Sequence, residues 1–446
     1  MTAFWWSSPA SNSLQVLFLL LIFLLPVQFG KHFWPDFSYL NGLRSDYLSP
    51  TLYLTDGVIF LILVIALPPL LDKLSRKTIF FAGSIILFFF ISSLLSAYPA
   101  NSVYGFLRML GYLSIAWIGS TLFTRGGFFQ KAKVVFLVSA SFVSLLAIAQ
   151  FYLQRSFGGW LYWFGERTFS AQTPGIAAVS LNGEVLLRPY ATFPHPNILA
   201  GYLLFVITLL LFYPPFSLQQ KYRWVSLLLF VFLSIGLLIT FSRVAILLWL
   251  GILLLVIFKY FKTKKYTVLL FTLVIVTVLL TPLGTRFRQT SFLEEGAQAR
   301  IELLEQSGKI IQTSPVIGVG MHNFLPTLAD TSPALPYRSL QPVHNIFVLF
   351  LTETGLVGLT LLLFTFRQMM RRVLLPSSQR ISKVVLLSCI LVIGSIDHYF
   401  LTLHQGQILL AIMLSVLWAI PMDTGRSSSL GPRSKGKYPN LNKTRK

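Results

Sequence analysis

The sequence has little charge and almost no cysteine for its length. Charged residues make up 11% of the 446 positions, whereas hydrophobic residues make up 55%. A soluble core of this length could not bury so much apolar surface, so the surplus is expected to face lipid. The one cysteine, Cys389, excludes an intramolecular disulfide and therefore says nothing about the redox compartment.

The sequence also lacks the motifs of nucleotide and metal chemistry. It contains no obvious repeat of about 20 to 50 residues and no glycine-rich phosphate loop. It contains no Asp-x-Asp pair and no histidine-rich ligand cluster. A nucleotide-driven motor therefore does not fit the sequence, and we expect neither a cofactor nor a metal.

Long apolar runs are what the sequence has in abundance. Many reach the roughly 20 residues that cross a hydrocarbon core of about 30 Å. We therefore predict an all-α polytopic membrane protein with about 12 transmembrane helices, near residues 13–29, 51–71, 78–97, 104–123, 134–153, 196–214, 224–240, 243–258, 266–283, 344–366, 383–402 and 404–420. The first run lacks a basic flank and a convincing cleavage site, so we interpret it as a retained helix rather than a signal peptide.

Basic residues are concentrated on one side of these predicted helices. The net charge is +22, and most Lys and Arg lie in the short connections 72–77, 124–133, 215–223, 259–265 and 367–383 and in the tail. The positive-inside rule makes that side cytoplasmic, so both termini are predicted to be cytoplasmic. The long connections 30–50, 154–195 and 284–343 are then extracytoplasmic.

The tail, residues 421–446, is basic and rich in Ser, Gly, Pro and Asn. We predict a disordered cytoplasmic segment that acts as a topology anchor, with binding to anionic lipid head groups as the alternative. In a soluble protein so much positive charge would suggest nucleic acid, but here it follows the topology. Membrane lipids, and no nucleic acid, are therefore the expected contacts.

The long connections should carry the chemistry, because function usually lies on such loops. Most of their basic residues are Arg, which grips phosphate oxygens in pairs, so they suit a phosphate-bearing ligand. The six histidines of the sequence lie on this side or at its membrane boundary: His32, His195, His322, His344, His398 and His404.

Within the last long connection, Ile301, Leu304 and Ile311 recur at helical spacing. This predicts an amphipathic helix that lies on the membrane surface or against the ends of the bundle and stops at Ser314-Pro315. Gly318-Val-Gly320 then predicts a sharp turn. Arg300, on the helix, could serve packing or contact a substrate.

Three segments carry a resemblance to a known family. They are Arg188-Pro-Tyr-Ala-Thr-Phe-Pro-His-Pro-Asn197, then Thr240-Phe-Ser-Arg243-Val-Ala, then Gly318-Val-Gly-Met-His-Asn-Phe with Val343-His344-Asn345 and Glu353-Thr-Gly-Leu-Val-Gly. In this order they resemble the O-antigen ligase family, over roughly residues 185–365. The resemblance implies a C-type glycosyltransferase-like fold in the bacterial inner membrane, with a large extracytoplasmic loop before the tenth helix.

The resemblance also implies a function. Members take a glycan from undecaprenyl pyrophosphate and pass it to an extracytoplasmic acceptor, which can be lipid A-core of lipopolysaccharide, a growing glycan or a protein. A transporter or flippase of lipid-linked sugars is the alternative, although we see no inverted repeat with broken helices that would favour it. A purely structural membrane component would not need an Arg inside a membrane hairpin.

The family's two essential arginines and one essential histidine would correspond to Arg188, Arg243 and His344. Arg243 has independent support: a helix over all of residues 224–258 would be about 52 Å long, too long for one crossing, so the run must fold back near Thr240 to Arg243. A charge at such a hairpin is a functional-site candidate, with snorkelling as the structural alternative. Asn197, Arg300 and Asn345 are second-tier candidates.

The implied mechanism is inverting and metal-independent. His344 would remove the proton of the acceptor hydroxyl, while Arg188 and Arg243 hold the departing pyrophosphate. His344 follows Pro342 at a predicted helix start, where the helix dipole and nearby arginines should keep the imidazole neutral. Three buried acids, Asp56, Glu353 and Asp397, stay unexplained, and for Glu353 we favour helix packing.

The chain is therefore expected to divide into four regions. These are N-terminal helices and an outer loop at 1–183, a catalytic region at 184–366, C-terminal helices at 367–420 and the tail at 421–446.

Overall fold

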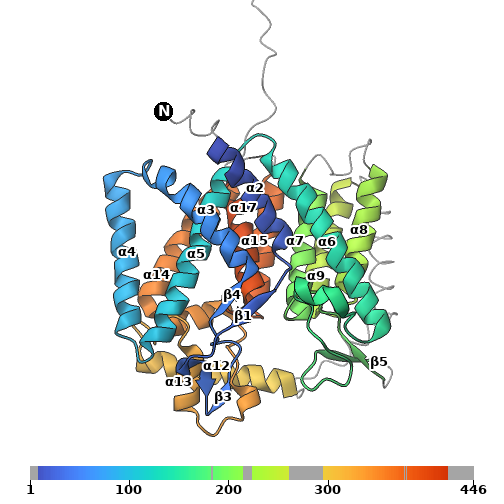
Figure 1. Cartoon of the computed structure of the whole chain (residues 1–446). Coiled ribbons are helices and arrows are strands. Elements are labelled where there is room, and N and C mark those ends of the chain that lie inside the picture. The colour runs from blue at the N-terminus through green and yellow to red at the C-terminus, as the bar shows by residue number, and fades with distance from the viewer. Residues whose placement is uncertain are drawn as a thin grey trace, which may run out of the picture.

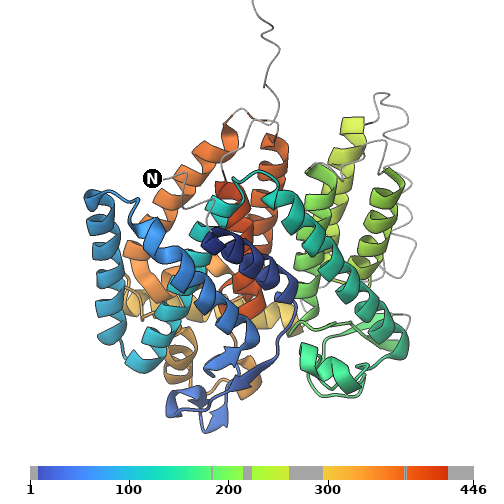
Figure 2. The same ribbon diagram turned by 45° about the horizontal axis from the view of Figure 1, so that its top comes forward.

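The computed structural model describes residues 9–181, 184–213, 223–260, 295–375, 377 and 379–419. Within these ranges the protein is a bundle of helices with three small two-stranded sheets (Figure 1 and Figure 2). The predicted helical fold class is confirmed. The predicted span 266–283, the start of the loop 284–343 and the tail 421–446 lie outside the described residues.

Eleven of the described helices fall on predicted spans. They are α2 (Pro9–Leu24), α3 (Leu54–Leu71), α4 (Arg76–Leu94), α5 (Pro99–Leu122), α6 (Phe128–Leu153), α7 (Pro196–Phe212), α8 (Arg223–Leu238), α9 (Arg243–Tyr260), α14 (Ile346–Leu374), α15 (Arg380–Gly394) and α17 (His404–Trp418). Among the described residues, α3, α4, α6 and α14 are long and apolar enough to cross a membrane, and α2, α7, α8, α9 and α17 are shorter apolar helices. The chain is thus a helical, multi-pass membrane protein, and the number of about 12 spans stays a prediction.

Helix α7 forms the centre of the bundle. Nearly every residue from Pro196 to Leu211 is buried, and α7 packs against α6, α8, α9 and α15. A helix that is apolar all round is expected in such a position, because it has no face for water. Its first turn, which holds Asn197, is thereby fixed at one end of the bundle.

The long connections fold together at that end. Strand β1 (Gly30–His32) pairs with β4 (Thr51–Tyr53), and β2 (Tyr39–Leu40) pairs with β3 (Leu43–Arg44). Helices α12 (Glu295–Thr313) and α13 (Phe324–Thr331) lie beside them, at the bottom of Figure 1, and α12 crosses the bundle at a steep angle. We call this the loop end.

The amphipathic helix α12 is confirmed and stops at Thr313, just before Ser314-Pro315. Its buried side is formed by Leu303 and Ile310, which pack with Leu328 of α13. Ile301 and Leu304 are each 49% exposed on the other side. The face of α12 that packs against the protein is therefore not the apolar face predicted from Ile301 and Leu304. That predicted face is exposed and could contact a membrane surface.

The predicted helix 383–402 is wrong in its second half. Helix α15 ends at Gly394, and only the short α16 (Tyr399–Thr402) follows. Between them, the Ser395 hydroxyl donates to the Leu391 carbonyl at 2.8 Å and the Asp397 carboxylate accepts from the His398 N–H at 2.8 Å. Such local side-chain bonds compete with the helix, so residues 395–398 form a loop.

Helix α14 also differs from its prediction. It begins at Ile346 rather than at residue 344, and it continues to Leu374. Gly355 breaks it, with φ 62° and ψ −164°. Only glycine adopts this conformation without strain, so the kink depends on that residue.

The connections predicted to be cytoplasmic meet at the opposite end of the bundle. Arg125 donates to the hydroxyl of Ser11, near the start of α2, at 2.5 Å. Arg372 and Lys383 donate to the carbonyls of Trp418 and Ala419, at the end of α17, at 3.2 and 2.7 Å. The start of α2 and the end of α17 thus lie at one end, as the charge pattern predicts; its cytoplasmic side, like the division into four regions, stays a prediction.

Candidate active site

Three arginines line one pocket at the loop end. The pocket has a volume of about 100 Å³ and is lined by Arg188, Asn197, Arg243, Arg300 and Asp397, together with apolar residues of α9 and α15 and Tyr399. The charged residues come from four separate segments of the chain. Because guanidinium groups bind anionic oxygens through paired N–H donors, three of them in one lining suit a ligand with several such oxygens.

Arg188 is buried and held from two sides. It follows the hairpin of β5 (Ala178–Leu181) and β6 (Glu184–Leu187), and only 7% of it is exposed. Its Nε donates to the Thr240 carbonyl at 2.7 Å, and its Nη2 donates to Asn197 Oδ1 at 2.7 Å. The guanidinium therefore joins the start of α7 to the turn between α8 and α9.

That turn confirms the predicted fold-back. Helix α8 ends at Leu238 and α9 begins at Arg243, whose side chain lines the pocket. Phe241 between them adopts a left-handed φ of 52°, which is costly for a residue with a large side chain. Its buried ring packs 5.9 Å from that of Phe151, and this packing holds the turn that presents Arg243.

Asn197 connects Arg188 to Asp397. Its Nδ2 donates to Asp397 Oδ2 at 2.8 Å, while its Oδ1 accepts from Arg188. Burial alone would raise the pKa of Asp397, but the imidazoles of His398 and His195 and the Asn197 hydrogen bond outweigh it and bring the pKa below the usual value. Asp397 is therefore ionised at neutral pH.

His344 lies beside the pocket rather than in its lining. Its ring meets that of His398 edge-on, with centroids 4.8 Å apart. Burial lowers the pKa of His344 to about 3. The positive charges of His398, Arg300 and His195 also lower this pKa, whereas the negative charge of Asp397 raises it. The pKa of His344 is thus lowered, as the sequence predicts, although burial lowers it more than the nearby charges do. Among the described residues, no group hydrogen-bonds its buried Nδ1.

A third histidine caps α7. The Nδ1 of His195 accepts from the Asn197 N–H at 3.1 Å, so this nitrogen carries no proton. Burial, followed by the positive charge of Arg188, lowers the pKa of His195 to about 4. From the sequence, His195 was predicted only to lie, like the other five histidines, on the extracytoplasmic side or at its membrane boundary. Its position directly before Pro196 was the signal that it could cap a helix.

The side chain of Asn345 has a structural role at the start of α14. Its Oδ1 accepts from the N–H groups of Phe347 and Val348 at 2.9 and 3.1 Å, and its Nδ2 donates to the Ser395 carbonyl at 3.2 Å. It thus caps α14 and ties that helix to the loop 395–398. Asn345 thereby positions His344 and His398 relative to each other.

The glycine-rich segment and the Glu353 segment form one joint. The N–H of Gly320 donates to the Glu353 carbonyl at 3.0 Å, and the Glu353 carboxylate accepts from the Phe324 N–H at 3.4 Å. Gly318 and Gly320 have φ of 73° and 100°, as the predicted sharp turn requires. These contacts agree with a packing role for Glu353.

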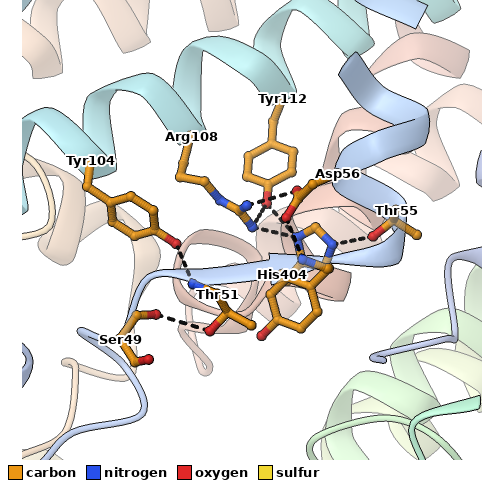
Figure 3. Close-up of polar contacts among 9 residues, drawn as sticks. Ser49, Thr51, Thr55, Asp56, Tyr104, Arg108, Tyr112 and His404 are labelled. Atoms are coloured by element: carbon orange, nitrogen blue, oxygen red, sulfur yellow. Dashed lines mark hydrogen bonds and ion pairs between the residues drawn. The ribbon is translucent and has the colours of Figure 1, made fainter. Parts of the chain in front are cut away.

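A second polar cluster, in which Arg108 and Asp56 form an ion pair (Figure 3), was not predicted from the sequence. Arg108 Nη1 donates to Asp56 Oδ1 at 2.8 Å, and its Nη2 lies 2.6 Å from His404 Nδ1 and also bonds the Tyr112 hydroxyl. The signal was present as opposite charges in two apolar segments, but the sequence does not show that they pair. None of these residues lines the arginine pocket.

No three His, Cys, Asp or Glu side chains in the described ranges are grouped so that they could hold a metal ion.

Comparison with known families now gives the pocket a context. Residues 228–363 match the model of the O-antigen ligase family, and no curated protein matches the chain. The match confirms the resemblance seen in the sequence and supports glycan transfer of the ligase or polymerase type by a membrane glycosyltransferase-like enzyme. It includes Arg243, Arg300 and His344, whereas Arg188 and Asn197 lie before it.

Proposed function

We propose that this O-antigen ligase-like chain transfers a glycan from undecaprenyl pyrophosphate to an acceptor outside the cytoplasm, by a metal-independent reaction that inverts the anomeric carbon. The observation that carries the proposal is the pocket whose lining brings together the guanidinium groups of Arg188, Arg243 and Arg300. A pyrophosphate offers several anionic oxygens, which guanidinium groups bind through paired N–H donors.

The arginines stabilise the leaving group. As the bond between the anomeric carbon and the pyrophosphate oxygen breaks, negative charge grows on that oxygen, and fixed donors aimed at it lower the barrier. Arg188 is fixed by Thr240 and Asn197, and Arg243 is the first residue of α9 and lines the pocket. The guanidinium of Arg188, held by these two hydrogen bonds, therefore needs little reorganisation during the reaction.

His344 is the general base. The acceptor hydroxyl gives its proton to the imidazole while its oxygen attacks the anomeric carbon. The burial that lowers the pKa of His344 to about 3 keeps the ring neutral and ready to accept a proton. The bound anionic donor raises that pKa again, because negative charge nearby favours the imidazolium, and this brings the base closer to the working pH.

Asp397 and Asn197 position the groups that react. Asp397 holds Asn197 through Nδ2, and Asn197 in turn holds Arg188. Asp397 also accepts from the backbone N–H of His398, whose ring contacts His344. One carboxylate is thus connected to both the pyrophosphate-binding arginine and the base.

The test is transfer by the purified protein in liposomes. The donor is a polyprenyl-pyrophosphate glycan, the acceptors are lipid A-core, a second lipid-linked glycan and a protein, and each reaction is run with and without chelator. We expect glycan on one acceptor with inverted anomeric configuration, unchanged by the chelator. Donor that crosses the bilayer with its glycan still attached and no product would instead indicate a flippase, and a need for a divalent ion would refute the metal-free mechanism.

A further inference from the structure

A second pocket lies between α3 and α5, and it differs from the arginine pocket in size and lining. It has a volume of about 380 Å³ and shares no lining residue with the arginine pocket. Most of its wall is apolar and comes from Phe33, Leu52, Ile59, Phe60, Leu63 and Leu107. We call it the α3–α5 pocket.

The polar part of the α3–α5 pocket is the ion pair of Figure 3. The side chains of Arg108 and Asp56 both line it and stay 18% and 17% exposed. A guanidinium has five N–H donors, and three contacts to Asp56, Tyr112 and His404 leave donors to spare. One cation and one anion are therefore within reach of a ligand.

Along the axis of α3, the polar lining residue of the α3–α5 pocket comes first and the apolar lining residues follow. Asp56 lies in the first turn of α3, next to β4 and the loop end, whereas Ile59, Phe60 and Leu63 follow deeper along this candidate membrane span. On the neighbouring segments, the Thr51 N–H donates to the Tyr104 hydroxyl at 3.4 Å, close to the polar part. A lipid has the same order, with its head group at the membrane surface and its chains inside.

We propose that the α3–α5 pocket binds one phospholipid molecule with a zwitterionic, ethanolamine-type head group. The phosphate contacts Arg108, the ammonium contacts Asp56, and one acyl chain lies against Ile59, Leu63 and Gly111. A purely anionic head group fits less well, because it would lie against the Asp56 carboxylate without an ammonium to offset the repulsion. The proposal does not depend on the transfer reaction.

Gly111 allows a direct test, because it lines the α3–α5 pocket and has no atom within 4 Å of an added Cβ. Gly111→Leu should therefore fill the pocket without a backbone clash. Gly83 of α4 is the matched control, since it is also helical, has no atom within 4 Å of an added Cβ and does not line the pocket. Both changes replace glycine by the same side chain in a helix.

The measurement is native mass spectrometry of each purified chain after delipidation and addition of phosphatidylethanolamine, phosphatidylglycerol or polyprenyl phosphate. We expect one tightly bound phosphatidylethanolamine on the unaltered chain and on Gly83→Leu, with at least about tenfold weaker binding to Gly111→Leu. Equal binding by Gly111→Leu would overturn the site. Equal or tighter binding of phosphatidylglycerol or polyprenyl phosphate would overturn the head-group assignment.

A second measurement needs no substitution and so does not depend on the folding of Gly111→Leu. Phosphatidylethanolamine with a photoreactive acyl chain is bound to the unaltered protein, irradiated, and the labelled peptides are mapped. Labels on α3 and α5 near Leu63 and Leu107 are expected. Labelling elsewhere with neither helix marked would refute the proposal.

Discussion

The two polar clusters of this protein differ in how their charges are balanced. In the α3–α5 pocket, Arg108 is matched by Asp56, so the cluster is neutral without a ligand. In the arginine pocket, the described lining residues include three arginines and one carboxylate, that of Asp397. Guanidinium groups from three separate segments that line one pocket indicate a ligand with anionic oxygens, whereas a matched pair can stabilise the bundle by itself.

The largest effect is expected at His344. His344→Ala should reduce transfer per folded molecule by about 100- to 10,000-fold, the usual cost of losing a positioned base. His404→Ala, in the matched cluster, should lower the amount of folded protein while transfer per folded molecule persists. Single-turnover transfer normalised to folded protein separates the two. Near-normal transfer by His344→Ala would remove it from the role of base.

Arginine geometry gives the next effect. Arg188→Lys and Arg243→Lys keep the charge but lose the paired N–H fork, so each should slow transfer by about 10- to 100-fold while membrane insertion survives. Arg338→Lys, at an exposed position of the loop end, is the control. Full activity of both pocket variants would show that pyrophosphate is held elsewhere.

Breaking the matched pair should affect stability rather than transfer. Asp56→Asn leaves Arg108 without its counter-charge, and because the pair is 17% and 18% exposed we expect a loss of about 2 kcal/mol, below the range for fully buried pairs. Asp46→Asn, in a pair with Arg167 at 4.0 Å that is far more exposed, should change little. Thermal unfolding in detergent measures both, and equal shifts would contradict the comparison.

The pH dependence is a smaller effect. The pKa of His344 is lowered to about 3, so the imidazole stays neutral above pH 3. The enzyme should therefore lose activity only when the pH falls to about this pKa. kcat/KM for the donor should therefore stay flat from pH 7 to about 5, where an ordinary histidine of pKa about 6.5 would already be protonated. The acidic limb of kcat should lie at higher pH, since bound donor raises the pKa. A kcat/KM limb near pH 6.5 would argue against a buried base.

The last prediction leaves both clusters intact. A reporter active only in the cytoplasm should work when fused after Lys77, Lys265 or Lys446 and fail after Gly175 or Ala334, because of the positive-inside pattern. Reporter fluorescence or enzyme activity relative to fusion level is the measurement. Activity after Ala334 would reverse the side on which the arginine pocket lies.

The sequence predicted the local parts of the site better than their partners. The fold-back before Arg243 follows from the length of an apolar run, and the turn at Gly318 follows from glycine chemistry. The pairing of Arg108 with Asp56 joins residues of separate helices, and no local pattern encodes it.

Asp397 shows the same limit. Its predicted helix 383–402 has the right composition, but the loop after Gly394 is held by bonds from distant residues, from Asn345 to the Ser395 carbonyl and from Asn197 to the Asp397 carboxylate. Its role beside Asn197 and Arg188 was therefore not visible, although its burial in an apolar segment was noticed. The pairing of His344 with His398 was hidden for the same reason.

The joint between the turn at Gly318 and the kink at Gly355 has one more consequence. A Cβ on Gly318 would collide with the backbone of Glu353, and a Cβ on Gly355 would collide with the backbones of Val316 and Gly318. Each of these positions thus requires glycine because the main chain of the other segment lies where a Cβ would be. Their substitutions should be strongly non-additive, because once one change has separated the two segments the second has little left to disrupt. A substitution at either glycine should therefore destabilise the protein about as much as substitution of both.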